Sequence, residues 1–160
     1  MHISTLTLWL PLIAVGLHIF EEFVFPGGFA DWYRQYDPPA AASITPRFLV
    51  IANVILIVLC LVPPLIGATV RGMGYWLIAS AVCAGNALWH CYAVWNKRRY
   101  SPGVVTGVLV YLPLAIYGVL AFVLTGFLSP FVVGEAALIG AGYAYWSIRR
   151  RRTKGAMGAP

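Results

Sequence analysis

Three ionisable side chains, His18, Glu21 and Glu22, lie close together in an otherwise apolar stretch, residues 6–25. A charged side chain at the centre of a membrane helix costs about 2.5–3.5 kcal/mol on insertion scales, so such residues usually have partners and a function. Because His18 lies three residues before Glu21 and four before Glu22, a helix places all three on adjoining parts of one face. One imidazole and two carboxylates so placed could bind a divalent metal ion or transfer protons.

A second polar pair, Asn86 and His90, repeats the spacing of four residues in another apolar segment, and Asn53 lies in a third. Residues four apart on a helix form a polar face about 6 Å tall. If the three segments are helices that carry these residues at one depth, the side chains can meet in a shared polar cavity.

The elements that must position these residues are membrane helices. Hydrophobic residues make up 61% of the chain and charged residues 10%, with a mean hydropathy of +0.81, whereas soluble proteins carry about 25% charged residues. We therefore predict an all-α fold: one domain, residues 1–148, with five transmembrane helices, and a basic tail at 149–160. Each span has about 20 apolar residues, enough to cross a bilayer: 4–25, 46–68, 73–95, 104–126 and 128–147.

The positive charges predict the orientation. Arg71 is the only Lys or Arg on one side of the predicted spans, and all the others lie on the opposite side or at its border. The positive-inside rule then gives an outside N-terminus and a cytoplasmic C-terminus, and it brings His18, Asn53 and His90 to one depth near the cytoplasmic leaflet. Topology and anionic lipids account for the net charge of +6, so we expect no nucleic-acid partner.

Three kinds of chemistry fit these residues. In the first, a metal ion (zinc, iron or manganese) is bound by His18, His90 and one glutamate, here Glu22. The other glutamate, Glu21, then acts as general base or bridges to a second ion, and Asn86 joins the two glutamates as a third catalytic side chain. A haem between the two histidines fits less well, because adjacent glutamates beside a haem face would be unusual.

In the second, no metal is bound, and the two carboxyl groups beside a histidine move protons during isomerisation or cyclisation of a polyprenyl or sterol-like chain. Trp89, next to His90, would stabilise a carbocation there. In the third, the cluster serves a small proton-coupled transporter or a ligand-binding membrane protein.

Further residues could form the wall of the site. Asn53 and Trp89 are candidates within the spans, and Arg98, Arg99 and Tyr100 could hold a head group at the cytoplasmic mouth; the two arginines could equally be positive-inside residues alone. The segment 29–36 is either an interfacial helix that covers the cavity or a simple loop.

Several of these residues also form a recognisable pattern: His18-x-x-Glu21-Glu22, then Asn86-x-x-x-His90, then Tyr100-Ser101-Pro102-Gly103 leading into Thr106. This pattern resembles the bacterial membrane proteins named for their HXXEE motif, whose function is largely unassigned. The resemblance implies a multi-span protein of the bacterial inner membrane with a polar centre that could bind metal. A looser, fold-level similarity to sterol isomerases of the emopamil-binding class and to carotenoid cyclases is an analogy only.

We therefore expect a metal-dependent membrane enzyme that acts on a lipid-like or isoprenoid-like substrate, with the metal-free enzyme and the transporter as alternatives. Its partners would be membrane lipids and that substrate. A homo-oligomer could form through small-residue helix faces such as Ala136, Gly140 and Ala144.

Overall fold

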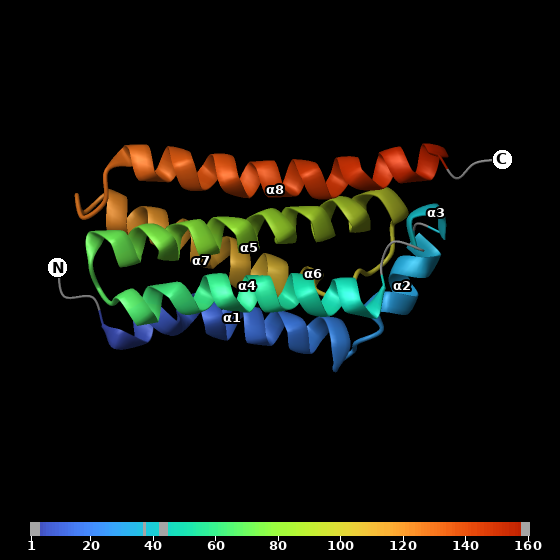
Figure 1. Ribbon diagram of the computed structural model, residues 1–160, viewed down its shortest axis with the longest axis horizontal. Coiled ribbons are helices and arrows are strands. Elements are labelled where there is room, and N and C mark those ends of the chain that lie inside the picture. Colours follow the sequence, from blue (N-terminus) through green and yellow to red (C-terminus); the bar gives the residue numbers. More distant parts are fainter. Residues whose placement is uncertain (1–3, 37, 42–44, 158–160) are drawn as a thin grey trace.

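The computed structural model describes residues 4–36, 38–41 and 45–157, with the side chains of 39, 40 and 150–157 excepted. Five long helical spans lie side by side along the molecule (Figure 1). Each is long and apolar enough to cross a membrane. The described residues contain helices and no strands, which confirms the predicted all-α fold. The spans are α1 (Thr5–Phe23), α4 (Pro46–Ile66), α5 (Val70–Lys97), a composite fourth span (Val104–Val123) and α8 (Pro130–Met157).

Hydroxyl side chains start four of these helices. Ser4, Thr45, Thr69 and Ser129 precede α1, α4, α5 and α8, and each accepts a hydrogen bond from a backbone N–H in the first turn. These side chains satisfy donors that have no partner within the helix. The fourth span has no such cap, because Gly103 stands at that position.

The fourth span changes its helical geometry along its length. It consists of α6 (Val104–Thr106), the π-helical segment η1 (Gly107–Tyr111), α7 (Leu112–Gly118) and a second π-helical segment, η2 (Val119–Val123). Pro113 has no N–H to bond to the preceding turn, which favours wider turns around it. Tyr111, at the end of η1, lies with its ring centroid 4.6 Å from that of His18.

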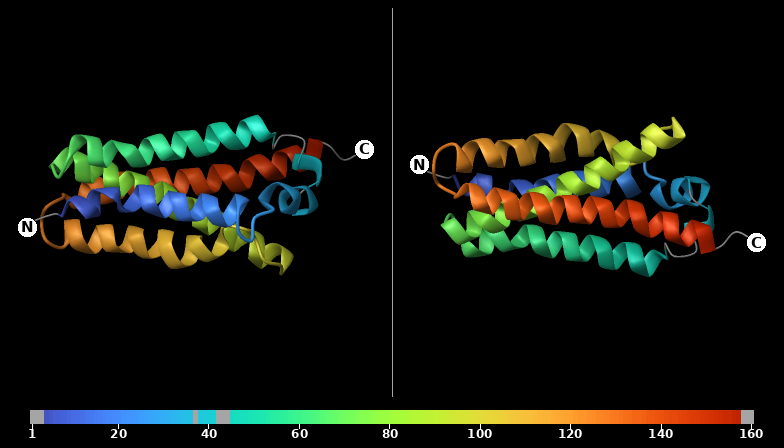
Figure 2. Two further views of the ribbon diagram at one scale, coloured as in Figure 1. Left: turned by 90° about the horizontal axis from the view of Figure 1, so that it is seen from below. Right: turned by 90° about the horizontal axis from the view of Figure 1, so that it is seen from above.

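Two short helices cover one end of the bundle, beside the end of α8 (Figure 2). They are α2 (Phe29–Tyr36) and α3 (Pro38–Ala41). The segment 29–36 is thus a helix rather than a loop, and its buried residues are Phe29 and Tyr33.

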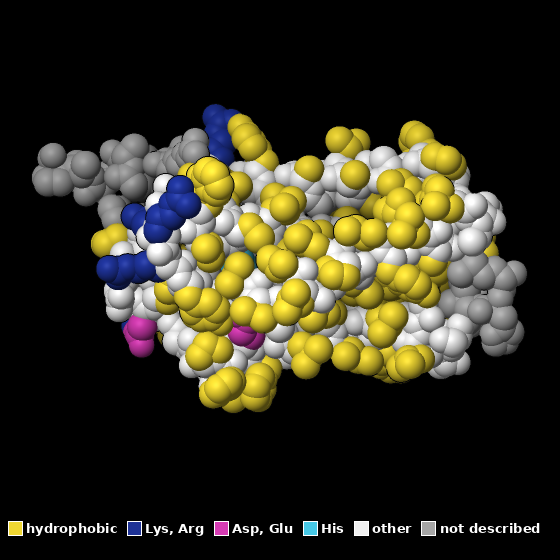
Figure 3. All heavy atoms as spheres, turned by 180° about the vertical axis from the view of Figure 1, so that it is seen from behind, with side chains coloured by type: hydrophobic (Ala, Val, Ile, Leu, Met, Phe, Trp, Pro, Cys, Tyr) yellow, Lys and Arg dark blue, Asp and Glu magenta, His cyan; other side chains and the backbone are white. Residues whose placement is uncertain are grey.

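Hydrophobic side chains cover the body of the molecule, whereas Lys and Arg gather at one end (Figure 3). Among the exposed apolar residues are Leu65, Phe131 and Leu138, each more than 70% exposed. An apolar belt of this extent is typical of a surface that faces lipid. Which end faces the cytoplasm stays a prediction.

Helix α5 is the central element, since it packs against α1, α4, the fourth span and α8. Glycines let it approach α8 closely: a Cβ on Gly85 would lie 2.4 Å from the Gly140 carbonyl oxygen, and one on Gly140 would lie 2.4 Å from that of Ala81. The small-residue face of α8 that we considered for an oligomer therefore packs against α5 of the same chain. Helix α8 continues to Met157, so the predicted basic tail is helical as far as the structure describes it.

Replacing Gly140 with alanine should lower the thermal unfolding temperature in detergent by about 2–12 °C, because overpacking costs about 1–3 kcal/mol. Gly142→Ala is the matched control, since a Cβ there meets nothing within 4 Å and alanine favours the helix. If both variants unfold at or above the temperature of the wild-type protein, the close contact between α5 and α8 is contradicted.

Candidate functional site

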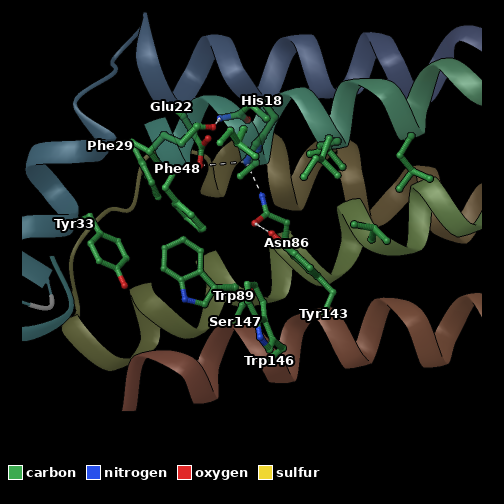
Figure 4. A pocket seen from close by; sticks show the side chains of 18 residues that line it. His18, Glu22, Phe29, Tyr33, Phe48, Asn86, Trp89, Tyr143, Trp146 and Ser147 are labelled. Atoms are coloured by element: carbon green, nitrogen blue, oxygen red, sulfur yellow. Dashed lines mark hydrogen bonds and ion pairs between the residues drawn. The ribbon is translucent and has the colours of Figure 1, made fainter. Parts of the chain in front are cut away.

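Two histidines and one glutamate from α1 and α5 meet inside the bundle, and Figure 4 shows His18 and Glu22 among them. Glu22 Oε1 lies 3.5 Å from His18 Nε2 and 3.2 Å from His90 Nε2. All three side chains are buried, and one potential ligand atom from each lies within 4.8 Å of the other two. The first and third spans therefore meet here, as the shared depth of their polar residues suggested.

The protonation of His18 follows from its neighbours. Thr106 Oγ1 donates a hydrogen bond to Glu21 Oε2 at 2.5 Å, so the same hydroxyl must accept from His18 Nδ1, 2.9 Å away. His18 therefore carries its proton on Nδ1, and its Nε2 is left with a lone pair. That lone pair accepts a hydrogen bond from Asn86 Nδ2 at 2.9 Å.

Asn86 connects His18 to the opposite wall of the site. Its Oδ1 accepts a hydrogen bond from the hydroxyl of Tyr143, on α8, at 3.4 Å. A chain of hydrogen bonds thus runs from α8 through Asn86 and His18 to Thr106 and Glu21 (Figure 4 shows the part from Tyr143 to His18).

Glu21 faces the start of the fourth span. Its carboxylate accepts hydrogen bonds from the backbone N–H groups of Val105 (3.0 Å) and Thr106 (2.7 Å), and from the Tyr100 hydroxyl (2.8 Å). The Thr106 hydroxyl is the fourth donor to this carboxylate. Glu21 thus supplies the cap that Gly103 cannot provide. Burial, and then the hydrogen bond and charge of Glu21, raise the pKa of Tyr100, so its phenol remains a donor.

His90 is held by the segment between α5 and the fourth span. Its Nδ1 lies 3.0 Å from Ser101 Oγ, and both residues are fully buried. Gly103, in the same segment, presses its backbone against both imidazoles: a Cβ there would lie 2.7 Å from His18 Cε1 and 3.0 Å from His90 Nε2. Any larger residue would fill the space that the two histidines face.

His18 and Glu22 of the cluster, with Asn53, Asn86 and Ser147, are among the residues that line a cavity of about 440 Å³, whereas His90 is not among its described lining residues. The cavity lies among α1, α2, α4, α5 and α8, and most of its wall is apolar. Phe29 and Tyr33 of α2 close the end of the cavity, and Trp89 packs against both of them (Figure 4). Buried polar groups at the tip of an apolar cavity are typical of a ligand-binding site.

The other predicted site residues lie at varying distances from the cluster. Asn53 lines the cavity, but its amide donates to the Leu49 carbonyl at 3.0 Å. Tyr100 donates to Glu21 and is not among the described residues that line the cavity. Arg98 and Arg99 are exposed and, among the described residues, do not line the cavity; the guanidinium of Arg98 lies over the ring of Trp95. Arg98 adopts the left-handed conformation, and the expected role of the two arginines in holding a head group stays a prediction.

Sequence reasoning gave no role to several residues that build the site. Ser101, Gly103 and Thr106 belong to the motif that carried the family resemblance, so a signal for them was present. The sequence held no such signal for Tyr143, because a single tyrosine in an apolar helix is common.

The donor set fits a divalent ion. Two ligands of a tetrahedral ion at about 2.1 Å stand about 3.4 Å apart, close to the 3.2 and 3.5 Å separations at Glu22. Each histidine has its Nδ1 hydrogen-bonded to a hydroxyl, the kind of outer partner that orients a metal ligand. Asn86 Nδ2 donates a hydrogen bond to the lone pair of His18 Nε2. This bond would have to break before an ion could bind to that nitrogen.

Glu21→Gln should destabilise the protein by at least about 2 kcal/mol, because hydrogen bonds to a charged group contribute about 1.5–3 kcal/mol each and an amide NH₂ would face donors. Thermal unfolding in detergent measures the loss. Glu135→Gln is the control, since Glu135 is exposed in the first half of α8. If both variants unfold at the same temperature as the wild-type protein, Glu21 does not hold the fourth span.

Gly103→Ala should destabilise the protein more than Gly126→Ala. Both glycines have positive φ, +96° and +73°, so both variants carry the backbone cost of about 1–2 kcal/mol. A Cβ on Gly126 meets nothing within 4 Å, whereas one on Gly103 collides with both histidines. Equal unfolding temperatures for the two variants would mean that the histidines can move aside freely.

Comparison with known proteins gives one match. A family model described as "Protein of unknown function with HXXEE motif" matches residues 9–118, which include the histidine and glutamate cluster and the segment that supports it. No curated protein and no solved structure matches the chain. The match covers well over half of the sequence, and the chain therefore belongs to the HXXEE-motif family.

Proposed function

We propose that this protein is a metal-dependent membrane enzyme that acts on a lipid-like substrate. The observation that carries the proposal is the meeting of His18 Nε2, His90 Nε2 and Glu22 Oε1 beside an apolar cavity that His18 and Glu22 line. Two imidazoles and one carboxylate form a frequent ligand set for catalytic zinc and iron, and they leave room for a further ligand.

His18, His90 and Glu22 would hold the ion, and a divalent ion bound there would supply Lewis acidity to a substrate oxygen. Thr106 and Ser101 would keep the two imidazoles oriented through their Nδ1 atoms. The general base that we expected in Glu21 has four hydrogen-bond donors around it, which favours a supporting role for this residue.

The membrane setting supports the second half of the proposal. We place the protein in the bacterial inner membrane with the site near the cytoplasmic leaflet, because Arg34, Arg47 and Lys97 lie on helices at the end of the bundle that holds the cluster. At that depth the substrate reaches the cavity as a component of the lipid phase.

A metal-free acid/base enzyme is the second candidate, and one contact favours it. Asn86 Nδ2 covers the lone pair of His18, so without an ion the nitrogen that can carry a proton toward Glu22 is His90 Nε2, at 3.2 Å. His90 Nδ1 would then accept from Ser101. This arrangement pairs a carboxylate with an imidazole that can exchange a proton with substrate.

Elemental analysis of the protein purified in detergent tests the proposal. We expect close to one zinc, iron or manganese per chain, and loss to background in His18→Ala and His90→Ala. Ser101→Ala should keep the ligands but weaken metal affinity about 10–100-fold, because it removes an outer partner.

Two controls sharpen this test. Glu135→Gln should keep its metal, since that carboxylate is exposed and outside the cavity lining. Asn86→Ala should keep or strengthen metal binding, because it frees the lone pair of His18. A wild-type protein that stays free of metal after incubation with each ion would overturn the proposal in favour of the acid/base enzyme.

A further inference from the structure

We infer that the ligand of the cavity is a single-chain amphiphile with an uncharged oxygen-bearing head group, which enters sideways from the bilayer between α4 and α8. The inference rests on the proposed function in taking the cavity as the substrate site, and it adds the entry route and the ligand class.

The route follows from the way the helices pack. Helices α4 and α8 both pack on α5 but hardly touch each other, and the cavity lies between them over Val82, Asn86 and Trp89 of α5. Its rim includes Ile51 and Ile55 of α4, which are 47% and 63% exposed. The cavity is therefore open on a side that faces lipid.

The end of the cavity is closed. Phe29 and Tyr33 of α2 are 6% and 1% exposed, and their rings pack against each other and against Trp89. A ligand coming from water would have to displace this aromatic cluster, whereas one coming from the bilayer has to pass only exposed aliphatic side chains at the rim.

The charges in and beside the cavity favour an uncharged head group. Among the described residues that line the cavity there is no Lys or Arg. Glu21 and Glu22 together already balance the two charges of a divalent ion, so a phosphate or carboxylate head would be an unpaired buried anion, which is costly. A hydroxyl can instead donate to Glu22, and a hydroxyl or carbonyl oxygen can accept from the amide of Asn86, at no such cost.

The size of the cavity favours a single chain. Its 440 Å³ lies in the lower part of the range of about 300–1,000 Å³ found for small-molecule pockets. Apolar residues, among them Leu56 and Leu59, continue along α4 away from the cluster and can contact a hydrocarbon tail.

The experiment uses the full chain in lipid nanodiscs with hexadecanol that carries a diazirine at the end of its chain. After illumination we expect crosslinks on the rim of α4 and α8, suppressed by excess hexadecanol. Hexadecyl phosphate should compete at least about tenfold more weakly. Val82→Trp, which fills the cavity, should reduce labelling about tenfold. If Val82→Trp fails to fold, Ala52→Trp, at the cavity wall on α4, replaces it in this test.

Val54→Trp is the matched control, because Val54 is exposed on α4 and outside the cavity lining. Equal labelling of the cavity variants and this control would overturn the cavity as the binding site. Equal competition by the phosphate would overturn the uncharged head group, and crosslinks on α2 instead of the rim would overturn lateral entry.

Elemental analysis of the same preparation separates this inference from the proposed function. Metal-loaded protein that is not labelled would refute the ligand class and leave the metal centre standing. Labelled protein that binds no metal would support the ligand class and refute the metal-dependent enzyme.

Discussion

The hydrogen bonds of the Glu21 carboxylate are the interaction on which the rest of the site depends. The first N–H groups of a helix have no partner within it, and hydrocarbon offers no water to replace one. Gly103 has no side chain to cap the fourth span, and a carboxylate from α1 does so instead. The same carboxylate fixes the hydroxyl of Thr106, and through it the tautomer of His18. One acidic residue thus joins two spans and orients a site histidine.

Glycine at position 103 makes this arrangement possible and also limits it. A side chain there could have capped the helix, but its Cβ would occupy the space in front of the two imidazoles. The positive φ of Gly103 adds a second reason for glycine. The adjacent glutamates therefore have separate tasks: Glu21 replaces the missing cap, whereas Glu22 faces the histidines.

The sequence was sufficient for the architecture, because five apolar segments and the hydrocarbon thickness leave little choice of fold. Helical spacing and a common depth also brought together His18, Glu22, Asn86 and His90, which the structure places in contact. The separate roles of Glu21 and Glu22 could not be predicted, since both lie at a helical spacing from His18, three and four residues away. Their difference comes from donors that lie 79 to 85 residues later in the chain, and no periodicity reports where that segment folds back. The left-handed conformation of Arg98 could not be predicted either, because no helical spacing reports it.

Asn86 makes the two candidate chemistries mutually exclusive at the level of atoms. A nitrogen lone pair can accept a hydrogen bond or bind an ion, but it cannot do both. With Asn86 bonded to His18 Nε2, Glu22 has only His90 as its imidazole partner, and the pair is suited to proton transfer. An ion held by both imidazoles and Glu22 would require Asn86 to release His18 Nε2. The Oδ1 of Asn86 accepts from Tyr143 on the cavity wall, so a ligand that competed for this bond would act directly on the amide that covers His18 Nε2.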